Sequence, residues 1–387
     1  MYDLIIKGGR VIDPAQNIDG VMDVAVEGGK IAKVTPDIPN KEAKRVRNAA
    51  GKIVTPGLID VHTHVYDGVI ENGVSPDDLG VKQGVTTVVD CGSSGWATFG
   101  GFPKYIIPNA KTTVYCLLHI GSFGLSSTPE LWYPEEINPA AFEACVVANP
   151  GLIRGVKIRV VGKLIASRGA EIVKIAKDTA KKVGLPLMVH IGDPNNWVPA
   201  TVTKDLLPLL EKGDILTHIY SGLQGGVLQA NGKVLPEFDE ARKRGVLFDV
   251  AHGRNNYNYS VARRMIAMGY LPNTLSTDTV RASLPGPVYG LMVTMSKFIA
   301  LGIPFEKEIP MVTINSARTV HIDDRKGSLK PGMDADISVL ELKSGKWRIL
   351  DFNNEVLNMD KMVTPFLTVK AGELITPKPV SWPEEVK

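Results

Sequence analysis

The sequence has few cysteines and no long apolar run. Three widely spaced cysteines, Cys91, Cys116 and Cys145, do not form the pattern of a disulfide framework, and they are typical of a reducing compartment. No stretch approaches the roughly 18 apolar residues of a membrane-spanning helix, and the opening MYDLIIKGGRVID lacks the apolar segment of a signal peptide. We therefore expect a cytoplasmic protein with no membrane partner.

The sequence also lacks a strong excess of charge. It has 44 basic and 41 acidic residues, a formal net charge of +3, and no dense basic run. This balance gives no support for a nucleic-acid partner, so a small-molecule substrate is the better expectation. The 387 residues, 44% of them hydrophobic, can bury a large core and suit a barrel with a smaller companion domain.

The central part of the chain alternates short apolar runs with segments of helical character such as Gly169–Val183. Strand-then-helix alternation indicates a parallel α/β fold, and eight such units predict a TIM (β/α)8 barrel over residues 54–324. The predicted strands are Val54–Val61, Gly84–Asp90, Thr112–His119, Leu152–Val160, Leu185–His190, Ile215–His218, Val246–His252 and Thr274–Asp278.

Both ends of the chain read as β-structure instead. Short strand candidates separated by Gly and Pro occur before residue 54 and again from Ala335 onward. We predict that residues 1–53 and 325–387 pair into one small β-sandwich domain beside the barrel.

The histidines are few, and their positions are the decisive observation. Of seven, only His321 lies beyond the eight predicted strands, and the other six stand at strand ends. The carboxyl ends of barrel strands meet at one mouth, where active sites lie. These strand-end residues are His62, His64, His119, His190, His218 and His252, with Asp278 ending the last strand.

His62 and His64 are separated by one residue, so on a strand both side chains face the same side. Alone, this pair is equally compatible with two polar strand-end residues and with a metal site. The residues at the later strand ends favour the metal site. Imidazole and carboxylate ligands suit zinc, manganese or iron.

Four motifs then resemble the amidohydrolase superfamily, in its order along the chain. They are VTPGLIDVHTH (Val54–His64), GVTTVVDCG (Gly84–Gly92), LSTD (Leu275–Asp278) and the long segment Asn315–Leu340. Within the superfamily the chain looks most similar to the dihydroorotase-like and deacetylase-like groups.

The resemblance implies two divalent metal ions, zinc by default and manganese or iron as alternatives. It assigns His62, His64 and Asp278 to one metal and His190 and His218 to the other. It also implies that Lys157 takes up CO2 and bridges the two as N6-carboxylysine; an ordinary solvated lysine is the alternative. A bridging hydroxide would attack the substrate carbonyl, with Asp278 as the catalytic general base and acid.

The substrate is less defined. Dihydroorotase-type sites carry an arginine two residues after the histidine pair, where this chain has Val65 and Tyr66. We therefore favour a deacetylase or deacylase of N-acyl amino acids or acetylated hydroxy acids. A cyclic amide hydrolase, an adenine deaminase-like enzyme and a non-catalytic binding homologue are the alternatives.

The loops after the predicted strands offer further groups. We expect substrate contacts from His252, Arg254, Tyr220, Ser122 and His119, any of which could instead order its loop. Cys91 follows the second strand and could bind metal, although a small buried residue is the commoner fate of a free cysteine. We also expect a homo-oligomer.

Overall fold

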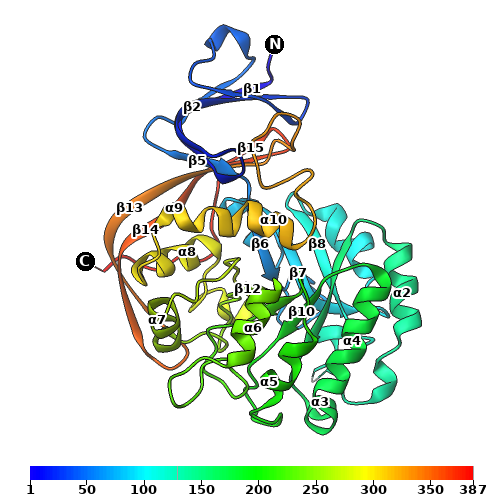
Figure 1. Ribbon diagram of the computed structural model, residues 1–387. Coiled ribbons are helices and arrows are strands. Elements are labelled where there is room, and N and C mark those ends of the chain that lie inside the picture. Colours follow the sequence, from blue (N-terminus) through cyan, green and yellow to red (C-terminus); the bar gives the residue numbers. More distant parts are fainter. Residues whose placement is uncertain (129, 387) are drawn as a thin grey trace.

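The computed structural model describes residues 1–128 and 130–386. Its strands form two hydrogen-bonded sheets, one of seven strands and one of eight. Figure 1 shows the seven-stranded sheet inside a layer of helices, with most of the other sheet standing above it and the β13–β14 hairpin running down one side.

The seven-stranded sheet is parallel and runs in chain order. Its strands are almost wholly buried, as expected where a parallel sheet is packed on both faces. The strands are β6 (Leu58–Thr63), β7 (Val85–Gly95), β8 (Thr113–His119), β9 (Ile153–Arg159), β10 (Leu187–His190), β11 (Ile215–Thr217) and β12 (Leu247–Asp249).

The predicted eighth strand, Thr274–Asp278, is not a regular strand. It makes single parallel bridges on either side, from Asp249 to Thr274 and from Thr63 to Thr279. Asp278 has a φ of 49°, which is outside the extended region and interrupts the ladder. Hydrogen bonds still join this segment to both neighbours, including Asp278 N to His62 O at 2.7 Å. The ring of strands is therefore closed by an irregular segment.

Helices cover the outside of the barrel. The predicted helix Gly169–Val183 is α4, in which Ile172, Val173, Ala176 and Ala180 are buried on one face and Gly184 ends the helix at a φ of 67°. The helices are α1 (Pro76–Leu79), α2 (Pro139–Ala148), α3 (Lys163–Arg168), α4 (Ala170–Val183), α5 (Val202–Leu206), α6 (Pro236–Arg244), α7 (Tyr259–Ala267), α8 (Leu291–Ala300), α9 (Phe305–Glu308) and α10 (Ile314–Thr319). Among the described residues, no helix has the length and hydropathy needed to cross a membrane.

The two chain ends form the other sheet together, because β13 pairs antiparallel with β5. Hydrogen bonds join its strands into one sheet, so the predicted sandwich of two sheets is not confirmed. The strands are β1 (Leu4–Asp13), β2 (Ile18–Glu27), β3 (Lys30–Thr35), β4 (Val46–Asn48), β5 (Ile53–Pro56), β13 (Ile337–Leu350), β14 (Val356–Lys370) and β15 (Glu373–Ile375).

The predicted single strand Val54–Val61 is two strands, β5 in the small sheet and β6 in the barrel. Gly57 joins them in a confined space, where a Cβ atom would lie 2.2 Å from Thr86 Oγ1 and 2.9 Å from Asp336 Cβ. The chain therefore changes sheets at a residue with no side chain. The domain boundaries at 53/54 and 324/325 stay a prediction.

The small sheet adjoins the amino-terminal ends of the barrel strands. One surface cavity is lined both by Thr113 and Val114 at the start of β8 and by Lys370 and Glu373 of the small sheet. The strand-end histidines therefore lie at the other end of the barrel.

Candidate metal centre

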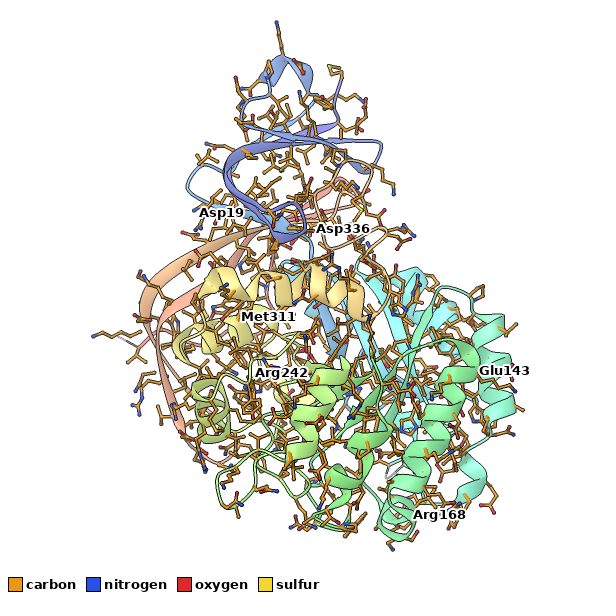
Figure 2. The ribbon with its side chains drawn as sticks, viewed as in Figure 1. Asp19, Glu143, Arg168, Arg242, Met311 and Asp336 are labelled. Atoms are coloured by element: carbon orange, nitrogen blue, oxygen red, sulfur yellow. The ribbon has the colours of Figure 1, made fainter. Side chains whose placement is uncertain are left out.

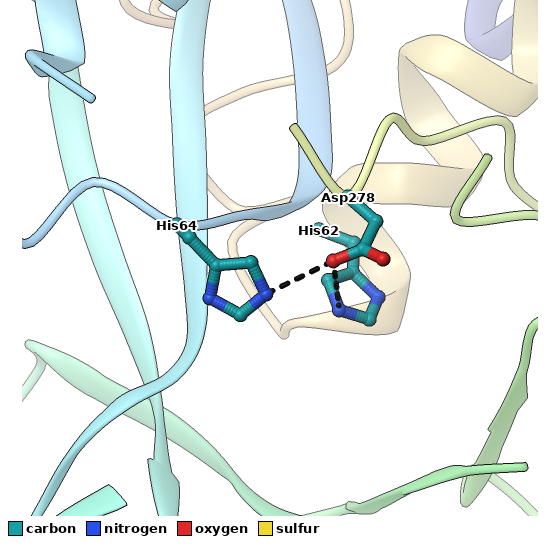
Figure 3. A group of neighbouring side chains, drawn as sticks. All are labelled: His62, His64 and Asp278. Atoms are coloured by element: carbon teal, nitrogen blue, oxygen red, sulfur yellow. Dashed lines mark hydrogen bonds and ion pairs between the residues drawn. The ribbon is translucent and has the colours of Figure 1, made fainter. Parts of the chain in front are cut away.

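His62, His64 and Asp278 form a compact buried group. One ligand atom from each lies within 4.8 Å of the others. His64 Nε2 is 2.9 Å and His62 Nε2 is 3.5 Å from Asp278 Oδ1 (Figure 3). His62 lies on β6 and His64 directly follows its last residue, Thr63, and the irregular segment after β12 brings Asp278 beside them. The predicted first metal group is thus assembled around one point.

A hydrogen-bonded relay fixes the orientation of His62. Its Nδ1 lies 3.1 Å from Thr217 Oγ1, and that hydroxyl donates to Asp249 Oδ2 at 2.8 Å. Because the Thr217 proton is used on Asp249, its oxygen accepts from His62 Nδ1–H. The lone pair of His62 is then on Nε2, which faces the group. Outer partners of this kind hold metal-binding histidines in the ligand tautomer.

Asp249 and Asp60 are positioning residues that the sequence analysis missed. Asp249 also accepts hydrogen bonds from Thr274 and Ser276, and Asp60 accepts from Thr277, so both carboxylates tie the irregular eighth segment to the barrel. Burial raises the pKa of Asp60 to about 7. The sequence contains a signal for both residues, because Asp60 precedes His62 by two residues and Asp249 ends the strand before His252.

His190 and His218 form the second group. Their ring centroids lie 4.1 Å apart, and each Nε2 is buried without a hydrogen-bond partner among the described residues. Ala251 O accepts from His218 Nδ1 at 2.8 Å, which leaves the lone pair on Nε2. Burial lowers the pKa of His218 to about 3 and that of His190 well below its usual value. Neutral imidazoles with free buried nitrogens fit a metal ion.

Lys157 is fully buried beside His62. Its Nζ is 3.0 Å from His62 Nε2 and 3.5 Å from Met188 Sδ. Burial lowers the pKa of Lys157, because the ammonium form is poorly solvated there. A buried amine biased toward its neutral form fits the chemistry of carboxylation, since only the neutral amine can add CO2.

A cavity of about 230 Å³ opens above these residues. His62, His64, Lys157, His190 and Asp278 line it, whereas His218 lies behind them. The rest of the wall is mainly polar and carries two cations, Arg159 and Arg254. The other lining residues are Ile70, Glu71, Asn72, Leu125, Thr128, Asn255, Asn256 and Val280.

Of the five predicted substrate contacts, only Arg254 lines this cavity; His252, Tyr220, Ser122 and His119 do not. Tyr220 packs against Tyr257, and its hydroxyl donates to Tyr270 O at 2.8 Å. His252 stacks on Tyr257 and accepts from Lys297 Nζ at 2.9 Å.

The other two are also held by their surroundings. Ser122 is buried in the turn after β8, where its carbonyl accepts from Ala97 N. His119 lies inside the barrel beside Lys157. All four residues that do not line the cavity are buried in the protein.

Arg159 also faces the interior of the barrel beside Lys157. It follows Lys157 by two positions on β9 and therefore faces the same side, and Glu130 is its ion-pair partner. The sequence analysis did not select this residue.

Cys91 is buried, donates its thiol to Val61 O at 3.1 Å, and is not part of the metal-binding group. Burial raises its pKa, which disfavours the thiolate that a metal would need.

Comparisons with known proteins agree with this geometry. The family model described as "Amidohydrolase family" matches residues 53–375. A deacetylase of Agrobacterium fabrum is 32% identical over 91% of this chain and 86% of its own length, and a deacetylase of Enterococcus faecalis is 31% identical over 96% and 99%.

Two solved structures are also similar. A crystal structure of an adenine deaminase has a TM-score of 0.89 at 30% identity and covers 97% of this chain and 100% of its own. A crystal structure of a dihydroorotase has a TM-score of 0.86 at 30% identity and covers 97% and 99%. The chain belongs to the amidohydrolase family and is a hydrolase.

Proposed function

We propose that this hydrolase removes an acyl group, in particular acetyl, from a small amide or ester that carries a carboxylate. N-acyl amino acids and acetylated hydroxy acids are the substrate class. The observation that carries the proposal is the small cavity whose floor is the metal-binding group and whose wall holds Arg254. The relatives named deacetylase, at 31–32% identity, support the same class.

We propose two divalent metals, zinc first. His62, His64 and Asp278 would hold one, His190 and His218 the other, and carboxylated Lys157 would bridge them. Bound there, the metals would lower the pKa of a water molecule and polarise the substrate carbonyl. The donor set fits a metal ion, because the buried Nε2 atoms of His190 and His218 have no hydrogen-bond partner among the described residues.

Asp278 would move the proton. Burial alone would raise the pKa of Asp278, but the hydrogen bond from His64 and the neighbouring His62 and His218 hold it below the usual value. The carboxylate is therefore ionised and can accept a proton. Its Oδ2 faces Asn256 Nδ2 at 3.3 Å. From this oxygen the proton of the attacking water would pass to the leaving nitrogen or oxygen.

Arg254 would bind the substrate carboxylate. It is exposed at the cavity rim, on the loop after β12 that also carries Asn256. A guanidinium can bind a carboxylate through two parallel hydrogen bonds. We expect Arg254→Met to lower kcat/KM for a carboxylate substrate by about 10–100-fold. The same substrate with a neutral amide in place of the carboxylate should show no such loss; an equal loss on both would reject this role.

The cyclic amide hydrolases are the second candidate, because a dihydroorotase structure is closely similar. The position of the expected arginine argues against dihydroorotate. Val65 and Tyr66 stand there, both are buried, and the Tyr66 ring stacks on Phe102 at 4.2 Å. No cation can reach the cavity from these two positions.

A substrate screen tests the proposal. Zinc-loaded protein would be assayed on N-acetyl and O-acetyl acids of both hands, beside dihydroorotate, hydantoins and adenine. We expect turnover of one or more acetylated acids. Turnover confined to the cyclic amides or adenine would overturn the substrate class. Less than about one metal ion per chain after metal supplementation would favour the non-catalytic alternative.

A further inference from the structure

His119 and Lys157 are direct neighbours on adjacent strands. In the parallel pair of β8 and β9, His119 is in register with Lys157, so both side chains project to the same face. Gly92 packs against both. A Cβ atom at Gly92 would lie 2.8 Å from Lys157 Cγ and 3.3 Å from His119 Cδ2. Cδ2 of the imidazole and Cγ of Lys157 therefore both border Gly92.

The tautomer of His119 is opposite to that of His62 and His218. Gly121 N–H donates to His119 Nδ1 at 3.0 Å, so Nδ1 holds the lone pair. Its single ring proton is then on Nε2. His62 and His218, by contrast, donate from Nδ1 and present a bare Nε2.

This Nε2–H is a buried donor without a partner among the described residues. His119 is 0% exposed, and Nε2 is bonded to Cδ2, the atom that borders Gly92 on the side where Gly92 also meets Lys157. An unsatisfied buried donor costs free energy, so such a group indicates a missing acceptor. A group added to a neighbouring side chain can supply that acceptor.

We propose that His119 is a positioning residue whose Nε2–H donates to a carbamate oxygen of carboxylated Lys157. The inference rests on the proposed function, which includes that modification. In its formation the lone pair of neutral Lys157 Nζ attacks the carbon of CO2 and a C–N bond forms. One C–O π pair moves onto oxygen, and one N–H proton leaves to solvent. The resulting anion offers oxygens to the metals and to His119.

A competing acceptor is Glu130, which is buried and already paired with Arg159. A bond from His119 to Glu130 would order the loop after β8 but leave the carboxylation of Lys157 unaffected. The two possibilities therefore differ in one measurable quantity, the bicarbonate concentration at which Lys157 becomes half carboxylated.

The test measures the carbamate itself. Metal-stripped protein would be reloaded with zinc at increasing ¹³C-bicarbonate, and the ¹³C carbamate resonance per chain would be integrated by NMR. The variants are His119→Leu, which removes the donor, and His119→Gln, whose amide can donate from a similar place. His321→Leu, at an exposed histidine outside the barrel, is the matched control.

A hydrogen bond to a charged group predicts that His119→Leu needs about tenfold or more bicarbonate for half loading. His119→Gln and His321→Leu should stay within about threefold of the natural chain. Equal half loading in all four proteins would overturn the role of His119. Equal impairment of the Leu and Gln variants would overturn it too, as a loss of packing. No carbamate signal in the natural chain would overturn both this role and the bridging lysine of the proposed function.

Discussion

The metal centre and the junction between the small sheet and the barrel both bury charged side chains, but they differ in the hydrogen-bond partners that their polar atoms have. We call Lys326, Asp334, Asp336 and Lys370 the junction cluster. There Asp336 accepts from Lys326, Lys370 and the Ala371 amide at 2.5–3.0 Å. Figure 2 labels Asp336 where the two parts meet. At the metal centre, by contrast, buried Nε2 atoms of His190 and His218 have no partner among residues 1–128 and 130–386.

The backbone does not separate the two regions. His218, Ala251 and Asp278 around the metal centre have φ values of 69°, 42° and 49°, and Ala371 at the junction has a φ of 49°, all in a region that side-chain-bearing residues rarely adopt. The comparison teaches that neither a buried charge nor a positive φ marks a site by itself. Neighbouring buried imidazoles with free ring nitrogens distinguish the metal centre.

The largest expected effect is at the metal centre. Asp278→Asn should lower kcat by about 10³-fold or more, because both a ligand and the proton carrier are lost. The free energy of unfolding of the metal-free protein should stay within about 1 kcal/mol, since Asn tolerates a positive φ. Steady-state kinetics and chemical denaturation check both. Wild-type turnover with metal bound would reject the mechanism.

The junction cluster should respond in the opposite way. Asp336→Asn leaves the buried Lys326 and Lys370 ammonium groups without their main counter-charge and should cost about 3 kcal/mol of unfolding free energy. The kcat of the folded enzyme should not change. Asp19→Asn is the control, because its ion pair with Arg10 is exposed and should contribute less than about 1 kcal/mol. A large fall in kcat for Asp336→Asn would contradict the claim that the junction cluster serves stability and the metal centre serves catalysis.

Lys297 is a case between the metal centre and the junction cluster. It is a buried amine that has hydrogen-bond partners, but these partners are neutral. It contacts His252 Nε2 and Pro287 O, and burial lowers its pKa to about 7, with Asp351 opposing that shift. Above this pKa the folded chain has released a proton that the unfolded chain keeps up to about 10.5. The unfolding free energy should therefore rise with pH in this window.

The expected rise is about 2 kcal/mol between about pH 7.5 and pH 9, at about 1.4 kcal/mol per unit. Lys297→Met should remove that slope, as measured by denaturation at each pH. The same slope in both proteins would show that Lys297 is already charged in the folded chain.

Much of the fold and of the metal centre could be predicted because strand periodicity and strand ends are local features. His62, His64 and Asp278 come together as their places in the barrel predict. The break at Gly57 was missed, because it depends on Thr86 and Asp336, which are distant in sequence. The surroundings of the predicted substrate contacts could not be foreseen for the same reason: Tyr220 and His252 are hydrogen-bonded to Tyr270 and Lys297, which are distant in sequence.

The central claim is that the unsatisfied nitrogens belong to a two-metal centre. A crystal structure of zinc-loaded protein, with anomalous maps on both sides of the zinc absorption edge, tests it directly. We predict two zinc peaks, one on His62, His64 and Asp278 and one on His190 and His218, with added density on Lys157 Nζ between them. A single peak or none, with Lys157 remaining an unmodified amine against His62, would contradict the account.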